Sequence, residues 1–184
     1  MIKICYERIE NVWFATAIDD NDRIVALSFS IREPETAVRR LLDMLPPNIE
    51  FRNEKTNEYF RNLFNTLYAI YDGKETKNSF VLKMDVFSPF TQAVLLKVAQ
   101  IPRGYVASYK EVAKAVYHEG AARAVGSVMA NNPFPLLIPC HRVILSDGKI
   151  GNYGLGSNLK KDILEREGIA IRKGRVERKY LWKF

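Results

Sequence analysis

The pattern of hydrophobic and polar positions divides the first half of the chain into short strands and helices. β-forming residues gather in two runs separated by a polar turn, which predicts a hairpin. Apolar residues then recur at helical spacing in two stretches, and a last strand-like run follows. The predicted elements are strand, strand, helix, helix and strand, over residues 12–18, 23–30, 34–45, 57–71 and 80–86.

The pattern changes at Ser88-Pro89, where serine can cap a helix and proline fits its first turn. Ser108 and Glu111 have the spacing of a capping box, which begins another helix. A short break ending in Gly120 joins this helix to the next, and such a pair predicts a helix-turn-helix. The predicted helices cover residues 89–101, 108–118, 121–130 and 157–168.

These boundaries predict three parts in the 184-residue chain. Residues 1–88 form an α/β domain without a catalytic cluster, and residues 89–168 form a mainly helical domain with the helix-turn-helix. Residues 169–184 form a basic tail.

Positive charge is concentrated in the second half. The formal net charge is +7, made up of −2 over residues 1–88, +4 over 89–168 and +5 over 169–184. This distribution indicates a polyanionic partner for the C-terminal half. Two interpretations of the tail stay open: it extends a nucleic-acid contact, or it packs on the domain surface through Tyr180, Leu181 and Trp182.

The helix over 121–130 carries small residues and a single charge, Arg123. Small side chains let a helix approach a surface closely, and a lone arginine can then insert, as in minor-groove binders. The alternative is a buried helix that packs closely through the same residues. The small residues are Ala121, Ala122, Ala124, Gly126, Ser127 and Ala130.

Cys140 is one of only two cysteines and lies between Pro139 and the basic pair His141-Arg142. A thiol is nucleophilic as thiolate, and nearby cations favour that form, so the motif predicts a reactive cysteine. The alternatives are a buried apolar cysteine, a metal site and a disulfide with Cys5. A metal site is disfavoured because the available cysteines and histidines lack the usual ligand spacings.

No targeting or membrane segment is evident. Charges at Lys3 and Glu7 come too early for the apolar region of a signal peptide, and no apolar run reaches the length of a membrane helix. We therefore expect free thiols and a cytoplasmic protein, nuclear if the source is a eukaryote, with no membrane partner.

Five ordered motifs between Phe90 and Gly168 resemble the O6-alkylguanine-DNA alkyltransferases, or methylated-DNA–protein-cysteine methyltransferases. The motifs are Ala121–Gly126, Asn132-Pro133, Pro139–Val143, Gly151-Asn152-Tyr153 and Glu167-Gly168. The resemblance implies a ribonuclease-H-like α/β domain at the N-terminus and a winged helix-turn-helix in the second domain. It also implies a monomer that acts on double-stranded DNA containing O6-alkylguanine, without a cofactor or metal.

The resemblance implies a stoichiometric repair reaction. The protein would bind the minor groove and flip the damaged guanine out of the duplex, while Arg123 fills the gap. Cys140 would attack the alkyl carbon, and His141 would accept the thiol proton through a water, oriented by Glu167. Tyr109 would donate to the departing guanine. Each molecule would react once, because the thioether product is a poor leaving group.

Further roles carry over by position. Backbone groups near Val143 and Gly154 would complete base recognition, and Tyr153 would form part of the pocket wall. Asn132 would hold the turn that presents the active-site segment. The implied residues are Cys140, His141, Glu167, Tyr109 and Asn132 for catalysis; Arg123, Ala122, Gly126 and Ser127 for DNA binding; and Pro139, Val143, Tyr153 and Gly154 for the pocket.

Two other functions stay open on the residues alone. A non-catalytic winged-helix protein would bind DNA with an incidental cysteine. A thiol hydrolase would use the Cys-His pair, although it would leave the basic half of the chain unexplained.

Overall fold

The computed structural model describes residues 1–77 and 79–184, which form two compact units. The first unit comprises Met1–Ile70 and Thr76–Val86, and the second comprises Tyr71–Glu75 and Phe87–Phe184. The predicted boundaries at residues 88 and 168 stay predictions.

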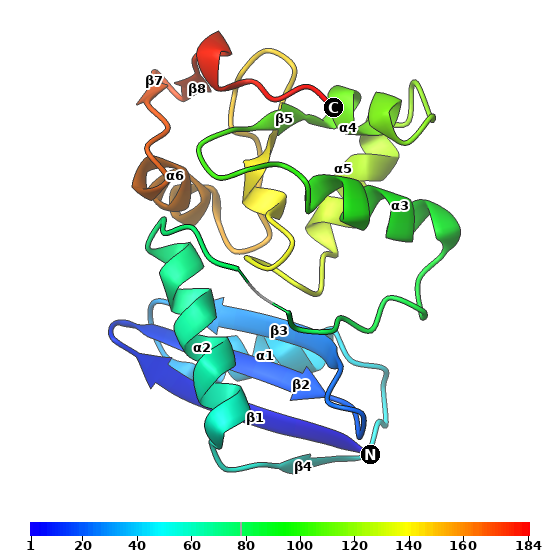
Figure 1. Ribbon diagram of the computed structural model, residues 1–184, viewed down its shortest axis with the longest axis vertical. Helices are drawn as coiled ribbons and strands as arrows, with labels where there is room; N and C mark the ends of the chain where they lie inside the picture. Colours follow the sequence, from blue (N-terminus) through cyan, green and yellow to red (C-terminus); the bar gives the residue numbers. More distant parts are fainter. Residues whose placement is uncertain (78) are drawn as a thin grey trace. The chain divides into compact units, whose positions relative to one another are not determined.

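The first unit is a four-stranded mixed sheet with a helix on each face (Figure 1). The strand order is β3-β2-β1-β4, with antiparallel neighbours except for the parallel pair β1–β4. The elements are β1 (Ile2–Ile9), β2 (Val12–Ile18), β3 (Ile24–Ser30), α1 (Pro34–Asp43), β4 (Phe51–Asn53) and α2 (Glu58–Tyr71).

Side chains along β2 point alternately to the two faces of the sheet and pack in a buried cluster on each face. Ala15 and Ala17 lie in a buried cluster with Ala37 and Leu41 of α1. Phe14 points to the other face, where its ring stacks on Phe64 of α2 at a centroid distance of 6.2 Å. Because both faces of β2 are covered, its side chains are buried almost without interruption.

The predicted hairpin and both predicted helices of this unit are confirmed, while the strand over 80–86 is wrong. Ile24 donates to the Val81 carbonyl and accepts from Lys83, which makes one parallel bridge at Leu82. Met84 N–H then donates back to Leu82 O at 2.9 Å, so the chain bends away from the sheet after one pairing. Strands β1 and β4 were not predicted.

The second unit is mainly helical, and its described residues also form two small sheets, each made of a pair of two-residue strands. Its elements are α3 (Pro89–Val98), β5 (Ala107–Ser108), α4 (Tyr109–Ala115), α5 (Ala122–Ala130), η1 (Cys140–Arg142), β6 (Val143–Ile144), α6 (Ser157–Arg166), β7 (Ile171–Arg172), β8 (Arg175–Val176) and η2 (Arg178–Tyr180). The predicted caps are confirmed: Ser88 Oγ accepts from Thr91 N–H, and Ser108 Oγ accepts from Glu111 N–H.

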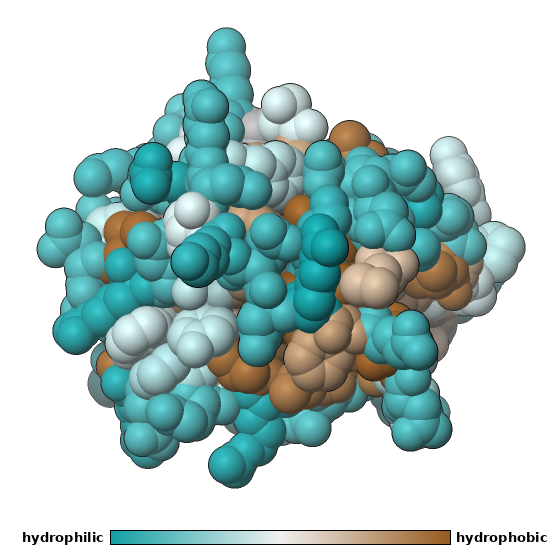
Figure 2. Space-filling model, turned by 90° about the horizontal axis from the view of Figure 1, so that it is seen from below, coloured by the Kyte–Doolittle hydropathy of each residue, from teal (hydrophilic) through white to brown (hydrophobic). Residues whose placement is uncertain are grey.

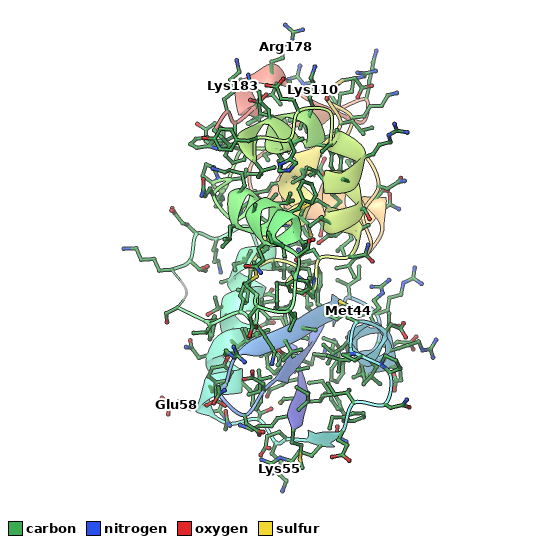
Figure 3. All side chains as sticks on the ribbon, turned by 90° about the vertical axis from the view of Figure 1, so that its right-hand side faces the viewer. Met44, Lys55, Glu58, Lys110, Arg178 and Lys183 are labelled. Carbon is green, nitrogen blue, oxygen red and sulfur yellow. The ribbon has the colours of Figure 1, made fainter. Side chains whose placement is uncertain are left out.

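Residues 169–184 are folded onto this unit. Val106 N–H donates to Tyr180 O, and Trp182 N–H donates to Val106 O at 2.7 Å. The tail therefore packs on the domain surface, as one interpretation predicts, and a nucleic-acid contact by its cations stays a prediction. Its cations stay outside: Arg178 and Lys183 project outward at the same end as Lys110 of α4 (Figure 3).

The outer face of the molecule seen in Figure 2 is mainly hydrophilic, with small hydrophobic patches between the polar side chains. Among residues 1–77 and 79–184, no helix has the length and apolar character needed to cross a membrane.

Candidate active site

Cys140 is the first residue of the short helix η1 and is buried. Pro139 precedes it, and the Cys140 N–H donates to Ile138 O at 2.7 Å, which fixes the backbone that leads to the thiol. The thiol Sγ lies 4.0 Å from Tyr153 Oη. Cys5 and Cys140 are both free, so the disulfide interpretation is wrong.

Burial raises the pKa of the Cys140 thiol. Hydrogen bonds from Asn132 and Tyr153 and the positive charge of Lys160 oppose this rise, because they favour the thiolate. The resting site therefore holds a neutral thiol whose ionised form already has partners.

His141 and Glu167 form a buried pair. His141 Nε2 lies 2.9 Å from Glu167 Oε1. Hydrogen bonds from His141 and Arg142 outweigh desolvation and lower the pKa of Glu167 to about 2, so this carboxylate is ionised at neutral pH. Burial lowers the pKa of His141, so its ring is neutral there.

These protonation states assign the tautomer of His141. An ionised Glu167 only accepts, so His141 Nε2 carries the proton and donates it. The lone pair is then on Nδ1, which is buried and has no hydrogen-bond partner within the part of the chain that the structure describes. His141 is thus prepared to accept one proton at Nδ1.

Arg142 also donates hydrogen bonds to the carboxylate of Glu167. Its Nε and Nη2 donate to the two carboxylate oxygens at 3.0 and 2.7 Å, and its Nη1 donates to Ile101 O at 2.7 Å. This bidentate contact fixes the plane of the carboxylate and therefore the orientation of the His141 ring.

Lys160 of α6 is a buried cation beside the cysteine. Its Nζ donates to Val143 O at 2.6 Å and to Asn152 O at 3.4 Å. Burial lowers its pKa to about 8, so it is mostly charged at neutral pH. Lys160 therefore joins β6 to the loop before α6 and adds a positive charge near the thiol.

Asn132 lies behind Cys140 in the turn after α5. Its Nδ2 donates to Ile138 O at 3.0 Å, and its Oδ1 accepts from Phe134 N–H at 3.0 Å. The side chain thereby closes the turn that leads to Pro139-Cys140, which is the geometry that the predicted role requires.

A pocket of about 650 Å³ opens onto Cys140. One part of its lining comes from Tyr109 and the α5 residues Ala122, Arg123, Gly126, Met129 and Ala130. The remainder comes from Cys140, Leu145, Ser146, Gly151, Asn152, Tyr153 and Gly154. This volume is within the usual range for small-molecule sites.

The exposed face of α5 borders this pocket. Val125 and Met129 are buried, whereas Arg123, Ala124 and Ala130 are exposed. The interpretation of α5 as a helix buried through its small residues is therefore wrong. Burial raises the pKa of Tyr109, so its hydroxyl stays protonated at neutral pH.

Not every residue implied by the resemblance reaches the pocket. Ser127 lines a different hollow beside α3, and Pro139 and Val143 lie behind the pocket wall. His141, Glu167 and Asn132 also stand behind the thiol, where they contact the segment that carries it. The catalytic and binding roles themselves stay predictions.

Two features of the site were not predicted from the sequence. One is the buried position of Lys160, and the other is the pair of hydrogen bonds from Arg142 to Glu167. A signal for Lys160 exists in the sequence, because it shares a helical face with Ile163, Leu164 and Glu167 at intervals of three, four and seven. A lysine among apolar positions indicates a buried cation. Within residues 1–77 and 79–184, no group of three side chains is suited to bind a metal.

Known proteins that resemble this chain include DNA methyltransferases of one family. Residues 89–169 match the DNA-binding domain of 6-O-methylguanine DNA methyltransferase. The chain is 39% identical over 112 residues to the methylated-DNA–protein-cysteine methyltransferase of Methanothermobacter thermautotrophicus, covering 60% of this chain and 62% of that protein. The enzyme of the same name from Sulfurisphaera tokodaii is 37% identical over 122 residues, covering 66% of this chain and 76% of that protein.

The match to the Methanothermobacter protein thus spans less than two thirds of that relative's length. A solved structure, Mycobacterium tuberculosis OGT in complex with DNA, is similar with a TM-score of 0.70 and 26% identity. This similarity covers 90% of this chain and 92% of the other, so both units share its mixed-sheet and helical fold.

Proposed function

The chain belongs to the O6-methylguanine DNA methyltransferase family, and we propose that it repairs DNA by moving an alkyl group from O6-alkylguanine to Cys140. The observation that carries this proposal is the buried thiol at a pocket, backed by His141 and an ionised Glu167. The reaction would be a methylated-DNA–protein-cysteine methyl transfer with no cofactor or metal.

The chemical step is a single displacement. The Cys140 thiol proton passes to His141 Nδ1 through a water, while Glu167 stabilises the imidazolium that forms. The sulfur then bonds to the alkyl carbon, and the bond between that carbon and guanine O6 breaks. Tyr109, protonated at neutral pH, passes its proton to the departing guanine, so that no free purine anion accumulates. The proton held by His141 then returns through water to the Tyr109 oxygen, so the guanine leaves neutral and both side chains regain their starting states.

The substrate would be duplex DNA with the damaged base flipped into the pocket. Arg123 and the small residues Ala122 and Gly126 form the lining on the α5 side, which suits a helix that approaches the minor groove closely. Arg123 would occupy the gap left in the base stack. The structure of a relative in complex with DNA supports DNA as the partner.

The finer description of the fold belongs to the same proposal. We describe the sheet of the first unit as ribonuclease-H-like, and α4 with α5 as a winged helix-turn-helix. We also propose that the protein acts as a monomer and that it works in the cytoplasm, or in the nucleus of a eukaryote.

Intact-protein mass spectrometry tests the reaction. After incubation with duplex DNA carrying O6-methylguanine, the protein should gain one methyl group on Cys140 and no more than one. Cys140→Ser should gain nothing, while Cys5→Ser serves as the matched control and should react like the wild type. Peptide mapping assigns the modified residue.

The same experiment separates the other two functions. A protein that binds the duplex without any gain in mass is a DNA-binding protein with an unreactive cysteine. Release of more than one product per protein molecule would identify a hydrolase, because a thioether at Cys140 would block a second turnover.

A further inference from the structure

Backbone contacts anchor the β7–β8 hairpin, which is labelled in Figure 1, to the turn over residues 147–150. Val176 N–H donates to Gly148 O at 2.8 Å, and Lys149 and Arg175 form an antiparallel bridge. A Cβ on Gly148 would come within 3.1 Å of Val176 O, so the two backbones approach closely. The residues at either end of this turn, Leu145, Ser146 and Gly151, line the pocket.

The hairpin itself is firmly held. Ile171 pairs with Val176 and Arg172 with Arg175, which leaves a two-residue loop. Lys173 and Gly174 in that loop have φ values of +50° and +71°, the conformation of a type I′ hairpin turn. Val176 is buried in a cluster that Ile171 also joins. The tip is thus presented by a fixed backbone.

The hairpin and its neighbouring turn carry more positive charge than the fold neutralises. Residues 147–150 and 171–179 contain six cations and two carboxylates. Each carboxylate serves two cations: Asp147 contacts Lys149 and Arg175, each at 3.4 Å. Glu177 likewise contacts Arg172 at 3.2 Å and Lys179 at 3.1 Å.

Two features of the hairpin place cations where they lower the stability of the fold. Arg172 and Arg175 are directly opposed across the hairpin, where like charges are destabilising. Lys173 adopts a left-handed backbone that favours Asn or Gly, and it has no ion pair within the described residues. Asp147 and Glu177 offset part of the charge of the two arginines, and an anionic partner would neutralise the charge that remains, above all that of Lys173.

We propose that this basic hairpin contacts the phosphate backbone of DNA at the rim of the pocket, in addition to the contact made by α5. The inference rests on the proposed function, because that function supplies the duplex. Lysine and arginine contacts to phosphate carry no sequence information, so the hairpin would strengthen and orient binding on damaged and undamaged DNA alike.

Salt-dependent binding to an undamaged, fluorescently labelled duplex tests the inference. The variant Arg172→Gln/Lys173→Asn removes two charges, and Asn suits the left-handed turn position. Each lost phosphate contact lowers the slope of log K against log salt by about 0.9, so the slope should fall by about 2. Affinity near 0.15 M salt should fall about ten-fold or more.

The matched control is Arg39→Gln/Lys55→Gln, which removes the same charge from exposed positions in the first unit (Lys55 is labelled in Figure 3). Its slope should equal that of the wild type. The control should keep the wild-type melting temperature, and the hairpin variant should equal or slightly exceed it, because the variant removes the opposed charge and places Asn at the left-handed position. Both variants should react normally with free O6-benzylguanine. Lys173→Asn alone should lower the slope by about 1.

The outcomes are distinguishable. If the hairpin variant and the control have equal slopes, the hairpin contact is overturned while methyl transfer to Cys140 still stands. If wild-type protein binds no duplex and gains no methyl group, the proposed function fails and the hairpin contact fails with it.

Discussion

Replacing Glu167 by glutamine would remove one buried negative charge while keeping the shape of the side chain. The carboxylate accepts from His141 Nε2 and from Nε and Nη2 of Arg142. Glutamine retains one acceptor oxygen. Its amide N–H group is a donor, and it would face the N–H donors of His141 and Arg142. The variant therefore leaves the Arg142 guanidinium without its counter-charge and no longer dictates the tautomer of His141.

The effect on stability follows from the pKa of Glu167, which falls from 4.5 to about 2 on folding. A shift of this size corresponds to about 3 kcal/mol of folding free energy. Because the folded pKa is the lower one, this stabilisation is present above pH 4.5 and is lost as the pH falls through about 2. At pH 7, Glu167→Gln should thus be less stable by about 3 kcal/mol.

Urea unfolding followed by far-UV circular dichroism, at pH 7 and at steps down to pH 2.5, measures this difference. Glu165→Gln is the matched control, since Glu165 lies on the same helix with an exposed side chain 3.7 Å from Lys161. Such a surface pair contributes about 0–1 kcal/mol. Burial lowers the pKa of His141, so folding also loses stability below pH 6.5; this loss is larger in Glu167→Gln, because Glu167 opposes that lowering. The difference at pH 7, where His141 is neutral, is therefore the one compared with about 3 kcal/mol.

The methyl-transfer rate should fall about 100-fold in Glu167→Gln, because the proton acceptor loses its orienting group. A difference well below about 3 kcal/mol between wild type and Glu167→Gln at pH 7 would refute the electrostatic argument. A wild-type rate of transfer would refute the orienting role of Glu167.

Three further predictions follow from other contacts. Arg123→Ala should slow repair of duplex DNA far more than reaction with free O6-benzylguanine, since only the duplex needs its gap filled; equal losses in a mass-spectrometric rate assay would contradict base flipping by Arg123. Lys160→Met removes a cation that favours the thiolate, so it should raise the pKa of the Cys140 thiol and slow methyl transfer. Thiolate absorbance measured against pH follows this change, and an unchanged titration of the thiol would disprove it. Gly73→Ala should cost more than about 3 kcal/mol in urea unfolding, since Gly73 has φ +74° and a Cβ would lie 2.1 Å from Arg166 O; a small loss would show that the backbone there yields.

Elements that depend on nearby residues were predictable. Ser88 and Ser108 cap helices whose first turns follow directly in the chain, and the hairpin over 12–30 closes through its own turn. In contrast, β4 was missed because it pairs only with β1, in parallel and with Ile2 beside Phe51, across almost fifty residues. Strand β1 was missed although it forms a local hairpin with β2, with Ile9 beside Val12. The strand expected over 80–86 failed because its β-forming residues find only a single pairing, at Ile24.

The candidate site divides in the same way. Adjacent residues in the chain place the thiol of Cys140, the imidazole of His141 and the guanidinium of Arg142 together, so a reactive cysteine and its family were evident from the residue order. Packing then brings Glu167 and Lys160 from α6 to that segment and folds the basic C-terminal residues beside the pocket. Ionisation of these groups depends on burial and on partners distant in the chain, so their charges and tautomers follow from the three-dimensional fold alone.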